Sequence, residues 1–381
     1  MQRSRGFSLV ELMISLVLGS VVIAGVAQLF VANSETSRLL QGQSRMQESA
    51  RFALEFISRN VREAGYRGCF SNPDFLNTTI FPVTNLPYEF DLRFGIQGYD
   101  ATGAGVWTPT IVGVLPTSDG SGDTNVFTTP GGEGAGNGID TSTIVPGTDI
   151  ITTRNASQVE ARLAEELNSA PEDPRVGIQV GWNEFDIDHL VLIHDCEKAT
   201  IFRVTAMTPD LGGNPSATAQ DLIVGHDIND VDATRNNNLQ LASVNTFDTD
   251  AAISAIETHT FFVAPGTGVN SEGNTPLSLW RKSGLTAPAE LVEGVEDLQI
   301  LYGVDTDGDN APNQYVGANF VGNWNDIVTV RVTVVVNSVD NVGATSAPTH
   351  GCTVQDCITG SSIDGLLRRS FTQTIQLRND G

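Results

Sequence analysis

The chain has 381 residues, of which 45 are Asp or Glu and 21 are Lys or Arg, so its formal net charge is −24 at pH 7. Such an acidic surface repels phosphate groups, so we expect neither nucleic acid nor anionic lipid as a partner of the soluble part. The sequence contains no Gly-x-Ser-x-Gly or His-Glu-x-x-His motif, and its five histidines are scattered. We therefore expect no enzymatic activity and no required cofactor.

The N-terminus combines a short basic leader with a long apolar run. The leader (residues 1–6) carries Arg3 and Arg5, and the only ionisable side chain of residues 7–32 is Glu11. No Ala-x-Ala-like cleavage site closes the run, so we expect the mature chain to keep it. At about 1.5 Å per residue it is long enough to span a bilayer, with the leader cytoplasmic and the rest exported. Removing the leader would change the net charge from −24 to −26.

Glu11 needs an explanation, because a carboxylate inside a membrane span costs a few kcal/mol or more. One interpretation places it at the headgroup level near the start of a helix, where the helix dipole favours negative charge. The other pairs it with a positive charge on another subunit. The position alone leaves both open.

The segment Gly6-Phe7-Ser8-Leu9-Val10-Glu11 resembles the class III signal of type IV pilins and of type II secretion pseudopilins. The resemblance implies cleavage between Gly6 and Phe7 by a prepilin peptidase and N-methylation of Phe7. It also implies that Glu11 neutralises the new amino terminus of a neighbouring subunit during assembly.

After Ala32 the helical pattern continues but becomes amphipathic. Apolar residues recur at steps of three and four, charged residues lie largely between them, and Gly65 and Gly68 are stop signals. The pattern predicts one helix over residues 7–65, with residues 7–32 in the membrane and residues 33–65 laid against a globular domain. The predicted apolar stripe is Leu39, Met46, Ala50, Ala53, Leu54, Ile57, Val61 and Ala64.

The remainder, residues 66–381, is predicted to form the exported domain. Residues from about 95 to 148 are rich in Gly, Pro, Thr, Asn and Asp and read as a surface insertion made of loops. One polar stretch, Gln158 to Asn168, is predicted to be a short helix. Short β-type segments are predicted at 149–153, 176–180, 189–194, 199–205, 221–224, 259–264, 277–281, 298–304, 327–336 and 370–377. A long helix followed by many strands favours an α+β fold with an antiparallel sheet on the helix.

Four cysteines in an exported chain predict disulfides. The short spacing of Cys352 and Cys357 favours a local pair, which leaves Cys69 to meet Cys196. A metal site built from His350, Cys352 and Cys357 is the alternative, although it lacks a fourth ligand nearby.

Three later segments extend the family resemblance. They are Glu290–Asp305, Trp324–Val328 and Arg369–Asn379, and they are similar to segments of the PilW family of large minor pilins. This resemblance implies a pilin-like α+β fold, in which the long N-terminal helix packs on an antiparallel sheet domain that carries long loop insertions.

An Asp-rich turn follows the predicted strand 298–304. Asp305, Asp307 and Asp309 alternate, so their carboxylates can converge on one hard cation, and Asn313 can add another oxygen. The pattern departs from an EF-hand, because Asn310 replaces the turn glycine and Val316 replaces the bidentate Glu. Calcium binding and a solvated acidic turn both remain open.

Together the two resemblances imply a minor pilin that primes or caps a type IV pilus together with other minor pilins and the major pilin. We expect a single-pass inner-membrane protein whose C-terminal domain lies in the periplasm until it enters the pilus. One alternative is a type II secretion minor pseudopilin, similar to the J component. The other is a calcium-dependent adhesive module at a pilus tip, with the Asp-rich turn and the Gly-rich insertion as its surfaces.

Overall fold

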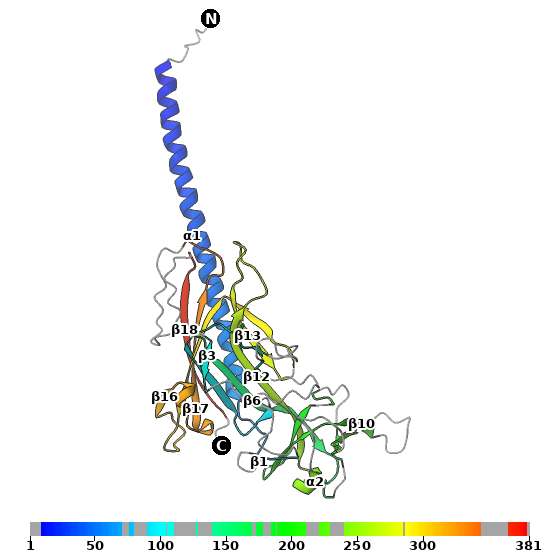
Figure 1. Ribbon diagram of the computed structural model, residues 1–381. Coiled ribbons are helices and arrows are strands. Elements are labelled where there is room, and N and C mark those ends of the chain that lie inside the picture. The colour runs from blue at the N-terminus through cyan, green and yellow to red at the C-terminus, as the bar shows by residue number, and fades with distance from the viewer. Residues whose placement is uncertain are drawn as a thin grey trace.

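A long helix with one half free of the domain dominates the computed structural model (Figure 1). Helix α1 spans Leu9–Glu63 without a break, which confirms the predicted single helix. It ends where Gly65 (φ 80°) and Gly68 (φ 72°) take left-handed conformations that other residues avoid. The structure describes residues 9–70, 76–79, 90–103, 105–109, 127–128, 139–169, 173–177, 184–187, 189–210, 221–228, 240–284, 286–343 and 365–378.

The second half of α1 packs on the domain through the predicted apolar stripe. Met46, Ala50, Ala53, Ile57 and Val61 are all buried, and they lie at steps of three and four along one face. Small alanines in this stripe let the sheet approach the helix closely. The prediction was wrong for Leu39, whose side chain is 42% exposed, because the buried contact begins only at Gly42.

A four-stranded antiparallel sheet, in the order β16-β15-β17-β18, packs against this half of α1. Alternate valines of its β-branched central strand β17, at positions 330, 332, 334 and 336, are buried in the same core as the helix stripe. Each such side chain contributes roughly 1.5–3 kcal/mol by burial. The strands are β15 (Val295–Val304), β16 (Gln314–Val316), β17 (Ile327–Asn337) and β18 (Arg368–Gln376).

A larger sheet of twelve strands continues away from the helix (Figure 1). Its main path is β1-β9-β8-β12-β6-β7-β11-β10; β13 joins β12 to β14, and β2 joins β6 to β3. The strands are β1 (Leu76–Thr78), β2 (Ile96–Gly103), β3 (Val106–Thr108), β6 (Ile150–Leu163), β7 (Arg175–Gly177), β8 (Leu190–His194), β9 (Ala199–Arg203), β10 (Ala206–Asp210), β11 (Asp221–Gly225), β12 (Ala252–Pro265), β13 (Leu277–Ser283) and β14 (Ala289–Glu293).

The two longest strands, β6 and β12, connect two hydrophobic cores. Near the helix, Ile151 and Phe261 belong to the core that contains the α1 stripe. Farther along the same strands, Ala161 and Ile253 belong to a separate distal core. A register shift between Ser254 and Ile256 divides the two stretches of pairing. The smaller elements are α2 (Leu241–Val244), the 3-10 turns η4 (Ala318–Phe320) and η5 (Trp324–Asp326), and the parallel pair β4 (Phe127–Thr128) and β5 (Ile139–Asp140).

Two further sequence predictions differ from this structure. The expected helix at Gln158–Asn168 was wrong, because its first six residues belong to β6, where Ala161 pairs with β12, Leu163 pairs with β7, and both are buried. Long-range pairing here overrides a local pattern that is polar enough for a surface helix. The expected loop region 95–148 contains strands β2 and β3, and Ile96 and Trp107 are buried there.

Candidate functional site

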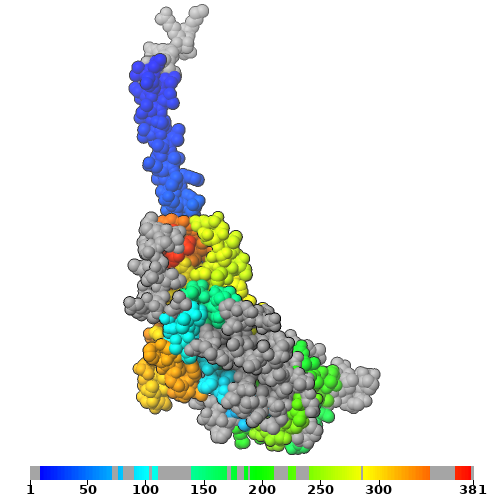
Figure 2. Space-filling model, viewed as in Figure 1, coloured from blue at the N-terminus to red at the C-terminus, as the bar shows by residue number. Residues whose placement is uncertain are grey.

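The most prominent candidate site is the part of α1 outside the domain, residues 9–41, which we call the stem. Figure 2 shows it standing clear of the domain. Its large apolar side chains between Leu9 and Val31 are 54–76% exposed. The helix contains an apolar window long enough to cross a membrane, with a mean hydropathy of 2.4 and no buried residue. A surface of this kind is stable only when lipid or other apolar helices cover it.

Glu11 lies in the first turn of α1 and is exposed. No ion pair joins it to any residue that the structure describes. Its backbone carbonyl accepts the hydroxyl of Ser15 at 2.8 Å, a bond that leaves the carboxylate unused. Within the described part of the subunit, the charge of Glu11 therefore has no compensating cation.

A second exposed apolar feature lies on the half of α1 that packs on the sheet. Phe52 and Phe56 are 47% and 37% exposed, and residues four apart lie on the same side of a helix. Their neighbours on this outer face include the exposed Glu48, Arg51 and Glu55. A pair of aromatic rings among charges is unusual for a face that meets only water.

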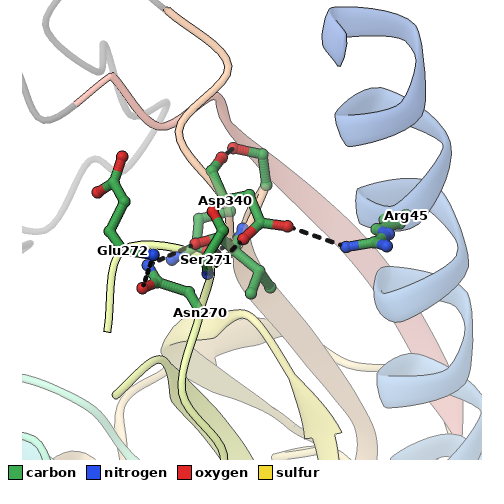
Figure 3. A network of polar contacts seen from close by, with 8 residues as sticks. Arg45, Asn270, Ser271, Glu272 and Asp340 are labelled. Atoms are coloured by element: carbon green, nitrogen blue, oxygen red, sulfur yellow. Dashed lines mark hydrogen bonds and ion pairs between the residues drawn. The ribbon is translucent and has the colours of Figure 1, made fainter. Parts of the chain in front are cut away.

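Where α1 leaves the domain, two loops border the helix (Figure 3). Arg45 on the helix forms an ion pair of 3.1 Å with Asp340, and Asp340 accepts the backbone N–H of Ser271 at 2.9 Å. This N–H and the Arg45 guanidinium keep the pKa of Asp340 below its ordinary value. Gly42 is buried against Val342, where a Cβ would come within 2.9 Å of Val342 Cγ1. Above these contacts a groove of about 1040 Å³ lies between helix and loops.

The disulfide Cys69–Cys196 joins two segments that are 127 residues apart in the sequence. Cys69 follows the end of α1, and Cys196 lies in the turn between β8 and β9. The positive φ of Gly68 directs the chain past the ring of His194, where a Cβ on residue 68 would collide. The bond therefore ties the end of the helix to the sheet at its distal side.

The two histidines that flank β8 lie at the ends of the strand, as the sequence indicates. His194 is buried, and its Nε2 lies 3.1 Å from the Ser254 hydroxyl. Burial lowers the pKa of His194, so the ring is neutral at pH 7. His189 precedes the strand, and its Nδ1 accepts the backbone N–H of Asp186 at 3.2 Å. These contacts of the two histidines stabilise the fold around β8.

The Asp-rich turn brings three carboxylates together. Carboxylate oxygens of Asp305, Asp307 and Asp309 all lie within 4.8 Å of one another. The backbone N–H groups of Asp307, Gly308 and Asn310 already bond to the Asp305 carboxylate, at 2.7–3.0 Å. Asn310 has φ 61° and so takes the glycine-like conformation that the turn requires.

Asn313, the fourth predicted ligand, has its side-chain oxygen turned to Thr306. Its Oδ1 accepts the backbone N–H and the hydroxyl of Thr306, at 2.6 and 2.9 Å. The turn is thus pre-shaped around Asp305, and calcium binding there remains a prediction.

Calcium should raise the unfolding temperature of the protein measurably at millimolar concentration, as many extracellular calcium modules bind in this range. Calorimetric titration and thermal unfolding of wild type and the Asp307→Asn/Asp309→Asn variant measure this. Both substituted residues are exposed, so the variant should keep the stability of the calcium-free protein. No heat and no stabilisation of wild type would exclude the site.

A buried carboxyl group that the sequence analysis missed lies between the two sheets. Asp149, beside β6, accepts the backbone N–H of Ala101 at 3.0 Å and that of Ile300 at 2.8 Å. The pKa of Asp149 is raised to about 8, chiefly by burial and to a smaller extent by the nearby acids Asp100 and Asp297, although the two hydrogen bonds act to lower it. In the sequence, Asp149 is a single acidic residue in a loop-like stretch, so no local pattern predicts that its carboxyl group is buried.

The raised pKa makes stability depend on pH through this one group. The folded state binds the proton more tightly than the unfolded state, so the linked stability is complete below about pH 4. It is lost progressively as the pH rises to about 8, by at most about 1.4 kcal/mol for each pH unit. Asp149→Asn removes this dependence, at a constant cost of about 1–3 kcal/mol, because an amide nitrogen cannot accept the N–H of Ile300.

Urea unfolding of both proteins at pH 5, 6, 7 and 8 tests this expectation. The stability of wild type relative to Asp149→Asn should fall as the pH rises, by up to about 1.4 kcal/mol for each pH unit, so that the variant becomes the more stable protein at pH 8. A difference that stays constant across this range would contradict the raised pKa.

Several predicted site residues lie outside the described part of the chain. These are Gly6 and Phe7 at the processing position, and Cys352 and Cys357 with the neighbouring His350. The processing site, the second disulfide and the alternative metal site therefore stay predictions.

Two family models match the chain. Residues 261–379 match the type IV pilus-assembly protein W family, and residues 1–27 match the prokaryotic N-terminal methylation motif. The first match covers β13 to β18 and therefore the whole four-stranded sheet that packs on α1. No curated protein and no solved structure matches the chain.

Proposed function

Since the chain is a PilW-like prepilin-type protein of the type IV pilus, we propose that it acts as a minor pilin that primes pilus assembly with other minor pilins. The observation that carries the proposal is the uncovered apolar stem. In the membrane, lipid covers this stem. When the subunit leaves the bilayer, the stems of other pilins must replace the lipid, because exposing so much apolar surface to water is energetically unfavourable.

In this role, Glu11 sets the register between the stems of neighbouring subunits. In an apolar bundle of stems, an unpaired charge is costly, whereas a carboxylate beside the amino terminus of a neighbour neutralises both groups. Cleavage before Phe7 would create that amino terminus next to the stem. Mass measurement of the membrane-extracted chain should therefore find it beginning at N-methylated Phe7.

Phe52 and Phe56 support a second subunit contact. Phe52 lies 20 residues beyond Ala32, about 30 Å along the helix axis, so lipid does not reach it. The stem of a neighbour that is displaced along the filament by a comparable distance would lie beside the two rings. The apolar contact would then continue from the stem onto the outer face of the domain.

Priming predicts a particular filament phenotype. Deleting the protein should lower the number of pili per cell and leave the length of the remaining pili unchanged, because a primer acts at initiation and not during elongation. Counting and measuring pili by electron microscopy tests this. Shorter pili in normal number would instead indicate a role in elongation.

The contact at the two phenylalanines can be tested separately. Phe52→Ser/Phe56→Ser should lower the pilus number at least about fivefold, since each lost apolar contact is worth about 1 kcal/mol or more. Stability should change little, because both rings are exposed and serine has a helix propensity close to that of phenylalanine. The matched control is Glu48→Ser/Glu55→Ser on the same face, and equal piliation in both variants would exclude the contact.

The two alternatives are less well supported. A type II secretion pseudopilin shares the N-terminal motif, but the match over residues 261–379 is to a pilus-assembly family. A calcium-dependent tip module depends on the Asp-rich turn. The matched families are structural components of pili, and we propose accordingly that the chain has no enzymatic activity.

A further inference from the structure

The groove at the base of the stem lies at the depth where phospholipid headgroups begin. Residues 9–32 of the helix span about 36 Å, slightly more than the roughly 30 Å of a bilayer core. Glu35 and Arg38 follow Ala32 by about 5 and 9 Å along the axis, and the headgroup layer is roughly 5–8 Å thick on each side. The Cα of Arg38 thus lies at the outer edge of this layer, and its long side chain can reach back into it, because helix side chains tilt toward the N-terminus. Both residues line the groove.

One face of the helix supplies this wall of the groove. Glu35, Arg38, Gly42 and Arg45 are separated by three and four residues, so they lie on one side of α1. The loops that carry Ser271 and Asp340 form the opposite wall (Figure 3). The floor is closed where Gly42 packs on Val342.

The charges of the groove are only partly compensated within the subunit. Arg45 and Asp340 neutralise each other. No ion pair or hydrogen bond joins the side chain of Glu35 or of Arg38 to another residue in the described ranges. Glu272, on the opposite wall, likewise has no ion pair among the described residues. One cation, Arg38, and two anions, Glu35 and Glu272, therefore face a polar groove beside the apolar residues Ala32, Leu39 and Val342.

We propose that this groove binds the headgroup of a zwitterionic phospholipid with a primary amine, of the phosphatidylethanolamine type, while the protein is anchored in the membrane. Arg38 binds the phosphate, and Glu35 accepts hydrogen bonds from the ammonium group. Ala32 and Leu39 contact the glycerol and the upper acyl chain. The acidity of the whole chain disfavours an anionic headgroup.

The site extends the proposed function by one step, because release of this lipid would accompany the transfer of the subunit into the filament. It rests on the membrane-anchored state and not on the priming role. Lipid retention and pilus number are measured independently, so a failure of the lipid site would leave the priming role standing.

Native mass spectrometry of the full-length protein tests the site, using micelles that contain equal amounts of phosphatidylethanolamine, phosphatidylglycerol and phosphatidylcholine. Wild type should retain one phosphatidylethanolamine per chain. Arg38→Gln should lower this retention at least about fivefold, whereas the control Arg51→Gln, exposed on the same helix but outside the groove, should not. Glu35→Gln should abolish the preference for phosphatidylethanolamine over phosphatidylcholine, whose quaternary amine donates no hydrogen bond.

Three outcomes would overturn the proposal. These are equal retention in Arg38→Gln and Arg51→Gln, a preference of wild type for phosphatidylglycerol, and loss of retention in all variants including wild type. A photo-crosslinking residue in place of Gln41, which also lines the groove, shows whether a lipid or a protein occupies the groove in membranes. Lipid adducts support the proposal, and adducts only with a protein would show that a partner subunit occupies the groove instead.

Discussion

Replacing Glu11 with alanine should leave the protein in the membrane and reduce its incorporation into pili at least about tenfold. The alanine makes the stem more apolar, so membrane insertion is not impaired. In the filament, however, the amino terminus of a neighbouring subunit would lose its counter-charge in apolar surroundings. A loss of only about 1.4 kcal/mol corresponds to a factor of ten, and an unpaired charge there costs several kcal/mol.

The measurement compares the amount of the protein in sheared pili with the amount in membranes. Glu48→Ala is the matched control, because it removes an exposed carboxylate from the same helix outside the apolar part. It should be incorporated like wild type. Full incorporation of Glu11→Ala would refute the pairing mechanism and would favour the interpretation of Glu11 as a headgroup-level carboxylate.

Removing the disulfide Cys69–Cys196 should lower the free energy of unfolding by about 2–5 kcal/mol. The bond closes a long loop, since 127 residues separate its cysteines, and it attaches the end of α1 to the turn between β8 and β9. In the Cys69→Ser/Cys196→Ser variant, the distal half of the large sheet should become sensitive to protease before the four-stranded sheet does. The four-stranded sheet packs on the helix through its own core.

Urea unfolding and limited proteolysis, with fragments identified by mass, measure these effects. The control is Cys352→Ser/Cys357→Ser, which removes the other predicted pair. Its loop would enclose only four residues, so its contribution in the chain-entropy account is much smaller. If the Cys69→Ser/Cys196→Ser variant is as stable as wild type, the disulfide contributes little to the free energy of unfolding beyond what side-chain packing already provides.

The membrane-proximal half of this protein could be predicted from its sequence because the signals there are local. An apolar run of this length forms a helix wherever it lies, and the steps of three and four from Met46 to Val61 define its buried face. The β-branched run at 327–336 likewise predicts β17 from its own residues. Of the PilW-like segments, 290–305 contains β15 and 324–328 leads from η5 into β17, so both contribute to the sheet that holds the helix.

Tertiary structure decided the features that depend on residues far apart in the chain. Residues 158–163 are strand because β12 and β7 pair with this stretch, and Asp149 carries a raised pKa because two sheets enclose it. The exposure of Phe52 and Phe56 and the groove beside Arg38 depend on which side of α1 the domain covers. Burial, pairing and electrostatic environment arise only when distant segments meet, so no local pattern encodes them.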